Sequence, residues 1–362
     1  MFNDLIFRQL FDAVSSTFTY LIGDPLSREA IYIDTVFEQH QRDRALIDEL
    51  DLKLVAVVDT HCHADHVTGA WLLQQTCSCE IGISARYGDN IEGVNSRFDD
   101  GDKIMFGQRY VQVRSTPGHT KGCASFVLDD QSAVFTGDAL LIRGAGRCDF
   151  QEGSAATLYN SIHDKLFSLP DTCLLYPGHD YNGRMLSSIG EERAHNPRIG
   201  GQADKRDFVG FMENLCLPHP RLIDIAVPAN QKSGKPEHVD APKAILWGPV
   251  RINYAGLQEI EPEWVARNLD SVYVLDVRDE VELQQGAGLI EGSQFIPLSQ
   301  LRERFTELPQ DKPIVAICHA GTRSAQATVI LANAGVAQVA NIRGGILLWQ
   351  QLGLPTHVQA TD

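Results

Sequence analysis

The sequence predicts an α/β protein built from two domains. Three observations support this: the length of 362 residues, an alternation of short β-branched apolar runs with helix-like segments, and a polar stretch containing Pro and Gly between residues 229 and 250. The composition, 43% hydrophobic and 22% charged, is typical of a globular protein. We expect one domain over 1–237, a linker over 238–254 and a second domain over 255–362.

The first domain begins with strands and one helix. Strand-like runs at Phe18–Ile22 and Ala30–Asp34 flank a turn at Gly23–Pro25. A helix is expected over Gln39–Leu52. The run Leu54–Val58 is apolar and rich in valine, so it predicts a buried strand.

The charge of the chain limits its partners. The formal net charge is −16, and no basic stripe interrupts it, which argues against nucleic acid or an anionic membrane surface. No apolar run approaches the roughly 18 residues of a membrane span, and we see no signal peptide, so a cytoplasmic protein is expected. Eight cysteines in so long a chain do not form a disulfide framework, and Cys77 and Cys79 are read as reduced thiols.

Three histidines and one aspartate occur within six residues, directly after the strand predicted at 54–58. A helix-like segment, Ala70–Leu73, follows them. Such a loop is where a rigid scaffold commonly presents functional groups. Imidazoles and a carboxylate at this density suit a first-row transition metal such as zinc or iron. The residues are His61, His63, Asp65 and His66.

Three further residues of ligand type occur downstream in matching contexts. They are His119, Asp138 and His179, which follow predicted strands at 110–114, 133–135 and 174–175. Each adjoins a glycine, which permits a sharp turn. Loops that leave one edge of a sheet sandwich are expected to converge, so we predict a metal centre there. The sequence alone permits one or two metal ions.

The ordered motifs H-x-H-x-D-H, TPGHT, TGD and PGHD resemble those of the metallo-β-lactamase superfamily. The resemblance implies an αββα sandwich with the metal site at one end of the two sheets. Within the superfamily, the stretch from Asp138 to Gln151 is similar to persulfide dioxygenases and unlike glyoxalase II. Ala145 stands where persulfide dioxygenases usually have Cys, and Cys148 where they usually have Thr, which leaves the substrate preference open.

The persulfide dioxygenase resemblance extends over roughly residues 1–235 and implies one Fe(II) per chain, held by His61, His119 and Asp138. Two histidines and one carboxylate leave three positions free, as in non-haem iron oxygenases. Four more residues would bind a second metal in two-metal relatives. Here they are expected to orient the ligands and the substrate; they are His63, Asp65, His66 and His179.

The substrate implied by the resemblance is glutathione persulfide, with O2 as the second substrate. Glutathione is anionic, and an arginine can bind a carboxylate through two parallel hydrogen bonds. Arg147 and Tyr181 match positions that contact glutathione in the glyoxalase II pattern. They are therefore the candidates for substrate binding.

The strand-and-helix pattern restarts in the second domain. Buried strands are expected at Val272–Asp276 and Ile314–Ile317, and a helix is expected to run to about Ala334. Cys318 lies between the second strand and this helix. Backbone N–H groups and the helix dipole favour a thiolate or a bound anion there, and Arg323 adds positive charge at the rim.

This half resembles a rhodanese, a sulfurtransferase domain. The matching pieces are the D-V-R run at 276–278, the six-residue loop Cys318–Arg323, and Gly344-Gly345-Ile346. The resemblance implies an α/β domain with a central parallel sheet, in which Cys318 attacks a sulfane sulfur and carries it as a persulfide. His319 and Thr322 fill variable positions of the loop, so the sulfur donor is left open.

Together, the two resemblances predict a persulfide dioxygenase–rhodanese fusion. The first domain would convert glutathione persulfide, O2 and water into sulfite and glutathione. The second would transfer sulfur between thiosulfate and glutathione, in a direction that the sequence leaves open. Fusion raises the local concentration of a shared intermediate.

Two alternatives are kept. One is a glyoxalase II-like glutathione thioester hydrolase with an accessory rhodanese domain. The other is a sulfide- or redox-sensing protein, with Cys318 as a regulatory thiol. A homodimer and the way in which the domains face each other are also left open by the sequence.

Overall fold

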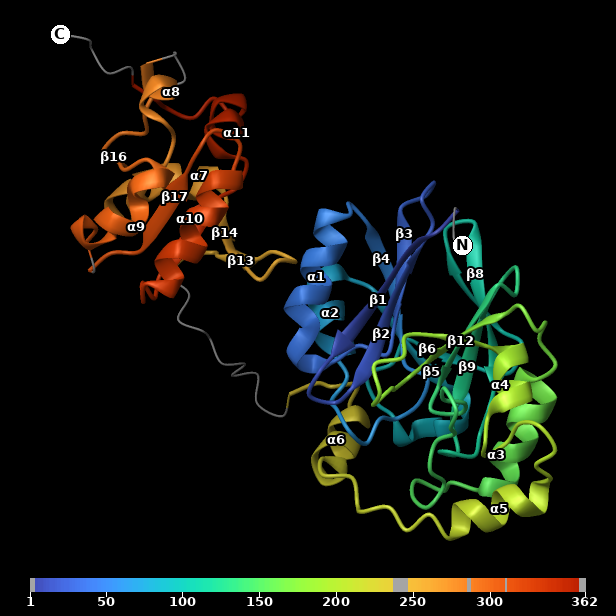
Figure 1. Cartoon of the computed structure of the whole chain (residues 1–362). Helices are drawn as coiled ribbons and strands as arrows, with labels where there is room; N and C mark the ends of the chain where they lie inside the picture. The colour runs from blue at the N-terminus through green and yellow to red at the C-terminus, as the bar shows by residue number, and fades with distance from the viewer. Residues whose placement is uncertain (1–3, 237–246, 285–287, 310, 358–362) are drawn as a thin grey trace. The chain divides into compact units, whose positions relative to one another are not determined.

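The computed structural model describes residues 4–236, 247–284, 288–309 and 311–357. The chain divides into two compact units, Met1–Val239 and Asp240–Asp362 (Figure 1). Of the expected linker, residues 238–246 lie outside the described residues. Later in that linker, Arg251–Ile252 form a short strand, β13, which belongs to the sheet of the second unit.

Two expectations from composition concern the whole chain. All eight cysteines lie within the described residues and are free thiols, as expected for Cys77 and Cys79. Among the helices of the described residues, none has both the length and the apolar character needed to cross a membrane.

The first unit contains two six-stranded mixed sheets packed face to face. The first sheet has the order β1-β2-β3-β4-β5-β6, and the second has the order β12-β11-β10-β9-β8-β7. The first comprises β1 (Ile6–Asp12), β2 (Thr17–Gly23), β3 (Glu29–Ile33), β4 (Lys53–Val58), β5 (Glu80–Ser84) and β6 (Ser96–Phe98). The second comprises β7 (Lys103–Phe106), β8 (Arg109–Ser115), β9 (Ala124–Leu128), β10 (Ala133–Gly137), β11 (Leu174–Pro177) and β12 (Ser187–Ser188).

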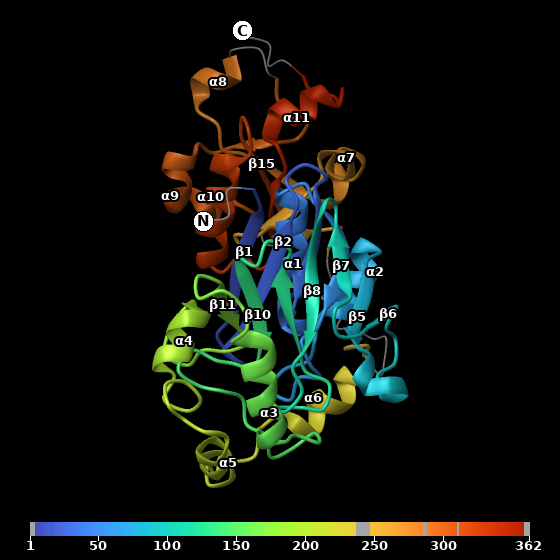
Figure 2. The same ribbon diagram turned by 90° about the vertical axis from the view of Figure 1, so that its right-hand side faces the viewer.

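Helices cover the outer faces of both sheets, which gives the expected αββα sandwich (Figures 1 and 2). Apolar side chains that alternate along the strands form the core between the sheets, with Phe18, Phe126 and Phe135 buried in it. Separate apolar clusters join each sheet to its own helices. The helices are α1 (His40–Glu49), α2 (Ala70–Cys77), α3 (Ala155–Ser161), α4 (Ile189–His195), α5 (Lys205–Glu213) and α6 (Ile223–Asn230).

Helix α1 is present as predicted but ends three residues early. It ends at Glu49, whereas the sequence pattern predicts a helix to Leu52. The reason is Asp51, whose φ of +50° places it in the left-handed region that commonly ends helices. The amide of Leu52 then bonds back to the carbonyl of Ile47 at 2.9 Å. The chain can thereby turn into β4.

The second unit has a central sheet with the order β13-β14-β18-β17-β15-β16, in which all pairs are parallel except the edge pair β13–β14. Apolar clusters lie on both faces of this sheet, which confirms the expected rhodanese-like architecture. The strands are β13, β14 (Gln258–Ile260), β15 (Tyr273–Asp276), β16 (Gln294–Phe295), β17 (Ile314–Ile317) and β18 (Val339–Ile342). The helices are α7 (Pro262–Arg267), α8 (Glu280–Gln284), α9 (Leu301–Arg304), α10 (Thr322–Asn333) and α11 (Gly345–Gln351).

A glycine next to a candidate ligand lets one of the covering helices approach. Gly118 precedes His119 and has a φ of +140°. A Cβ at this position would lie 2.4 Å from backbone atoms of Leu158, which is buried in α3. The amide of Ser154, the N-cap of α3, also bonds to the carbonyl of Gly118 at 2.7 Å. Only glycine therefore allows this loop and α3 to pack as they do.

We expect Gly118→Ala to lower the free energy of unfolding of the first unit by about 2 kcal/mol or more, because the new methyl group must displace the backbone of α3. The control is Gly101→Ala. Gly101 also has a positive φ, of +93°, but a Cβ there would meet no atom within 4 Å. Calorimetric unfolding of the full chain measures both. Equal losses at the two glycines would contradict the packing argument.

Candidate active sites

Four strands of the first unit deliver the predicted ligands to one place. The loop after β4 carries His61, the loop between β8 and β9 carries His119, and Asp138 and His179 directly follow β10 and β11. All four strands were predicted at these positions. Because β10 and β11 run parallel, Asp138 and His179 leave the sheet at the same edge.

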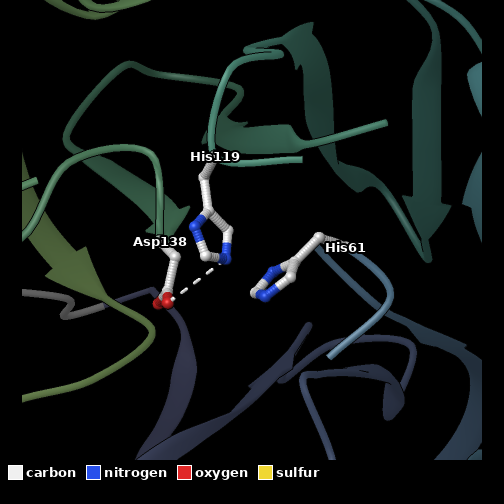
Figure 3. Close-up of side chains that lie close together, drawn as sticks. All are labelled: His61, His119 and Asp138. Atoms are coloured by element: carbon white, nitrogen blue, oxygen red, sulfur yellow. Dashed lines mark ion pairs between the residues drawn. The ribbon is translucent and has the colours of Figure 1, made fainter. Parts of the chain in front are cut away.

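His61, His119 and Asp138 face one another (Figure 3). Each offers one ligand atom, and these atoms lie within 4.8 Å of one another. His119 Nε2 lies 3.6 Å from Asp138 Oδ2, and the two imidazole rings are 4.9 Å apart at an angle of 86°. Two imidazoles and one carboxylate thus surround a single point, which is the donor set that first-row transition metals bind.

Hydrogen bonds fix which nitrogen of each imidazole is free to bind a metal. His119 Nδ1 donates to the carbonyl of Arg147 at 2.6 Å. The hydroxyl of Thr60 donates to Asp34, so its oxygen accepts from His61 Nδ1 at 3.0 Å. Both rings therefore keep an unprotonated Nε2, as a metal ligand must. Burial lowers the pKa of His61 well below its ordinary value, which also favours the neutral ring.

Asp138 provides a further sign that the donors suit a cation. Its Oδ1 atom is buried and has no hydrogen-bond partner among the described residues; His179 Nε2 lies 3.6 Å away, beyond hydrogen-bond distance. A buried carboxylate oxygen without a donor is costly unless a cation or a proton faces it. The three residues therefore fit a bound metal ion.

The other predicted residues lie beside this triad and form a second group. His63, Asp65 and His66 also bring their ligand atoms within 4.8 Å of one another. Asp65 Oδ2 lies 3.1 Å from His66 Nδ1 and 3.4 Å from His179 Nε2. His179 Nε2 in turn lies 3.6 Å from Asp138 Oδ1. All seven predicted ligand-type residues are therefore brought together at one end of the sandwich.

Two buried aspartates at this site were not predicted from the sequence. Asp34 accepts hydrogen bonds from the amide and hydroxyl of Thr60 at 2.7 and 2.8 Å, and from His63 Nε2 at 3.1 Å. Burial, and then the charge of Asp34, raise the pKa of Asp59 to about 8. Each aspartate directly follows a strand. That position is the sequence signal that could have identified them.

The triad opens onto a cavity of about 940 Å³, a volume suited to a small-molecule ligand. The two predicted substrate-binding residues, Arg147 and Tyr181, both line it. Tyr181 is 72% exposed, and its ring stacks parallel to the His179 ring at 6.0 Å. The sequence prediction thus selected two residues that share one cavity with the metal ligands.

Arg147 is held by several partners. Its guanidinium forms two hydrogen bonds to Asp149, of 2.7 and 2.6 Å. It also donates to the carbonyls of Pro218 at 2.7 Å and Leu217 at 3.2 Å. Both lie in the segment 214–222 between α5 and α6, which contributes Leu217, Pro220, Arg221 and Leu222 to the cavity wall. Arg147 therefore positions part of this wall.

The second unit presents Cys318 at the end of β17, as predicted. Its Sγ accepts hydrogen bonds from the amide of Gly321 at 3.1 Å and from the hydroxyl of Ser324 at 3.3 Å. Burial opposes ionisation, yet the hydrogen bonds from Ser324, Gly321 and Ala320 hold the pKa of the Cys318 thiol below its ordinary value. The loop thus favours a thiolate, the nucleophilic form of cysteine.

Arg323 lies at the rim of this loop, where the sequence placed it, but its charge is already paired. It contacts both carboxylate oxygens of Glu282 at 2.5 and 2.7 Å, and Asp279 at 3.2 Å. The hydrogen bond from Arg323 lowers the pKa of Glu282 to about 2. Neither Glu282 nor the thiol contact of Ser324 was predicted. Glu282 lies in α8 and Ser324 in the first turn of α10, so each contact depends on how these helices pack beside the loop that carries Cys318.

We expect Asp138→Ala to remove the transition metal from the first unit, because the triad would lose its only carboxylate. Elemental analysis of the purified full chain measures the metal-to-protein ratio. The matched control is Asp89→Ala, an exposed aspartate outside the site, which should keep the full ratio. A full metal load in Asp138→Ala would exclude Asp138 as a ligand.

We expect Ser324→Ala to raise the pKa of the Cys318 thiol by about one pH unit, because the thiolate loses one hydrogen bond. In the wild type the lowered pKa means that thiolate is already present below the ordinary thiol pKa, so the change shifts its appearance to higher pH. The measurement is thiolate ultraviolet absorbance against pH, with Cys318→Ser subtracted. Exposed Ser271, changed to Ala, is the control. An unshifted titration in Ser324→Ala would show that the hydroxyl does not stabilise the thiolate.

Comparison with known proteins agrees with this geometry. The family model of the metallo-beta-lactamase superfamily matches residues 13–179, and that of the rhodanese-like domain matches residues 261–352. The chain is 52% identical over 231 residues to human "Persulfide dioxygenase ETHE1, mitochondrial", a match that spans 64% of this chain and 89% of the relative.

Two solved structures are also similar. ETHE1 from Myxococcus xanthus is 50% identical, with a TM-score of 0.61, and the match covers 64% of this chain and all of that one. A metallo-beta-lactamase from Staphylococcus aureus is 22% identical, with a TM-score of 0.60 over 94% of this chain and 98% of that one, which shows a shared fold alone. From its site geometry and these similarities, the chain belongs to the metallo-β-lactamase superfamily, as an ETHE1-like persulfide dioxygenase domain joined to a C-terminal rhodanese domain.

Proposed function

We propose that the first unit oxidises glutathione persulfide with O2 and water, and releases glutathione, sulfite and two protons. The observation that carries this proposal is a triad of two imidazoles and one carboxylate on the wall of a cavity, in a chain 52% identical to a persulfide dioxygenase. We propose that His61, His119 and Asp138 hold one Fe(II). Bound there, iron would supply the redox chemistry that lets O2 react with the outer sulfur of the substrate.

The protein's own groups prepare this site in two ways. The carbonyl of Arg147 and the hydroxyl of Thr60 fix the tautomers of His119 and His61, so that no proton has to leave before the metal binds. His63, Asp65, His66 and His179 lie next to the triad, and we propose that they orient ligands and substrate. Arg147 and Tyr181 both line the cavity, and we propose that they contribute to glutathione binding.

For the second unit we propose sulfur transfer between thiosulfate and glutathione. The Cys318 thiolate attacks the outer sulfur of thiosulfate, forms a persulfide and releases sulfite. The glutathione thiolate then attacks the outer sulfur of that persulfide, which gives glutathione persulfide and regenerates the Cys318 thiolate. The amide of Gly321 and the hydroxyl of Ser324 stabilise the negative sulfur. The same steps in reverse would make thiosulfate from sulfite.

A second candidate is a glyoxalase II-like thioester hydrolase with two metal ions. The specific observation in its favour is that His63 Nδ1 and His66 Nε2 are buried and have no hydrogen-bond partner in the part of the chain that the structure describes. Two free imidazole nitrogens next to Asp65 could hold a second ion. This candidate requires two metals per chain and hydrolysis of S-lactoylglutathione without O2.

The test is O2 uptake by the full chain, loaded anaerobically with Fe(II) and then given glutathione persulfide. We expect one O2 consumed for each sulfite released. Cys318→Ser should keep this uptake and lose sulfur transfer from thiosulfate to glutathione, because the two reactions use separate sites. Absence of uptake with iron bound, together with hydrolysis of S-lactoylglutathione, would favour the second candidate. Loss of both activities in Cys318→Ser would contradict the two-site proposal.

A further inference from the structure

The cavity of the first unit is lined by five arginines, in a protein of net charge −16. Three of them are neutralised by neighbouring carboxylates. Arg143 pairs with Glu191 and Glu192, Arg147 pairs with Asp149 at 2.6 Å, and Arg184 pairs with Asp180 at 2.8 Å. The remaining two are Arg198 and Arg221.

Arg198 has no carboxylate within ion-pairing distance among the described residues. Its Nη1 donates to the carbonyl of Ala145 at 2.9 Å, and its guanidinium lies 5.4 Å from the centre of the Phe211 ring. The side chain is half-buried, and burial lowers the pKa of Arg198. A half-buried cation with only a neutral acceptor is poorly compensated, and an anionic ligand would complete its surroundings.

Arg221 has neither a hydrogen bond nor an ion pair with any described residue. It lies on the segment 214–222, which the Arg147 guanidinium holds through the carbonyls of Leu217 and Pro218. The charge of Arg147 is balanced by Asp149, and its other N–H groups are already hydrogen-bonded to this segment. The positive charge that is free to meet a ligand in this cavity therefore belongs to Arg198 and Arg221.

We propose that Arg198 and Arg221 form the carboxylate-binding part of the cavity, and that they select a peptidic persulfide by the carboxylates at its ends. This inference rests on the proposed function. Among the arginines that line the cavity, these two have no carboxylate partner in the described residues, so a doubly carboxylated ligand would meet their charge unopposed. Arg147 is then chiefly a positioning residue for the wall that carries Arg221.

Calorimetric titration with S-methylglutathione tests this without turnover. The ligand keeps both carboxylates of glutathione but carries no persulfide, and it is added to the metal-loaded full chain. We expect Arg221→Gln and Arg198→Gln each to weaken its binding by about tenfold to a hundredfold, as for the loss of a charge-assisted hydrogen bond. Arg221→Lys should recover part of the loss, because it keeps the charge.

Two controls separate recognition of the carboxylates from general damage. Arg206→Gln removes a 90% exposed arginine of α5 that does not line the cavity, and should bind as the wild type does. The diamide of S-methylglutathione, which lacks both carboxylates, should bind equally weakly to the wild type and to the two glutamine variants. Because Arg221 is exposed, its replacement should leave thermal unfolding unchanged.

The outcomes distinguish the two proposals. If S-methylglutathione binds to the wild type and binds equally well to both glutamine variants, the carboxylate site is overturned and the proposed function stands. An S-methylglutathione that does not bind to the wild type overturns both, because the cavity would then not receive a glutathione-like ligand. Weakened binding confined to the carboxylate-bearing ligand supports the inference.

Discussion

The first unit depends on keeping several imidazoles and carboxylates buried together without uncompensated charge. His61, His63 and His119 are almost fully buried, and at such a site each ring must be neutral or paired. The arrangement of hydrogen bonds around Asp34 meets this condition, because that one carboxylate orders Thr60 and His63, and Thr60 in turn orders His61. Hydrogen bonds within the protein thus fix the orientation of His61 and His63.

The second unit also holds a chemically reactive group in a buried place, but it stabilises that group, the Cys318 sulfur, with a backbone amide instead of a carboxylate. The parallel strand β17 ends at Ile317, directly before Cys318, and helix α10 begins at Thr322. A left-handed glycine, Gly321, turns the loop so that its amide faces the sulfur. Gly345 makes room on the other side, since a Cβ there would lie 2.6 Å from the carbonyl of Cys318. The first unit keeps imidazole nitrogens unprotonated so that they can bind a cation, whereas the second unit stabilises the anionic sulfur of Cys318.

Much of both sites could be predicted because the ligand-type residues directly follow apolar strand runs. His61, His119, Asp138 and Cys318 all have this pattern, and the fold brings strand ends together by simple rules. Contacts between loops could not be predicted in this way. The pairing of Arg323 with Glu282 requires α8 to lie beside the cysteine loop. His119 bonds to the backbone carbonyl of Arg147, and because every residue has such a carbonyl, the sequence does not reveal this contact. The end of α1 was misplaced for a local reason, the left-handed backbone of Asp51.

Arg147 serves the cavity through two chemically separate parts. Its carbonyl holds His119, and its guanidinium holds the segment 214–222. Every amino acid has a carbonyl, so the metal ligand keeps its support whichever side chain occurs at position 147. The cavity wall formed by the segment 214–222 has no such protection, because its position depends on the Arg147 guanidinium. Over evolutionary time, the substrate-facing side of this cavity can therefore diverge through single substitutions while the chemistry of the metal centre is preserved.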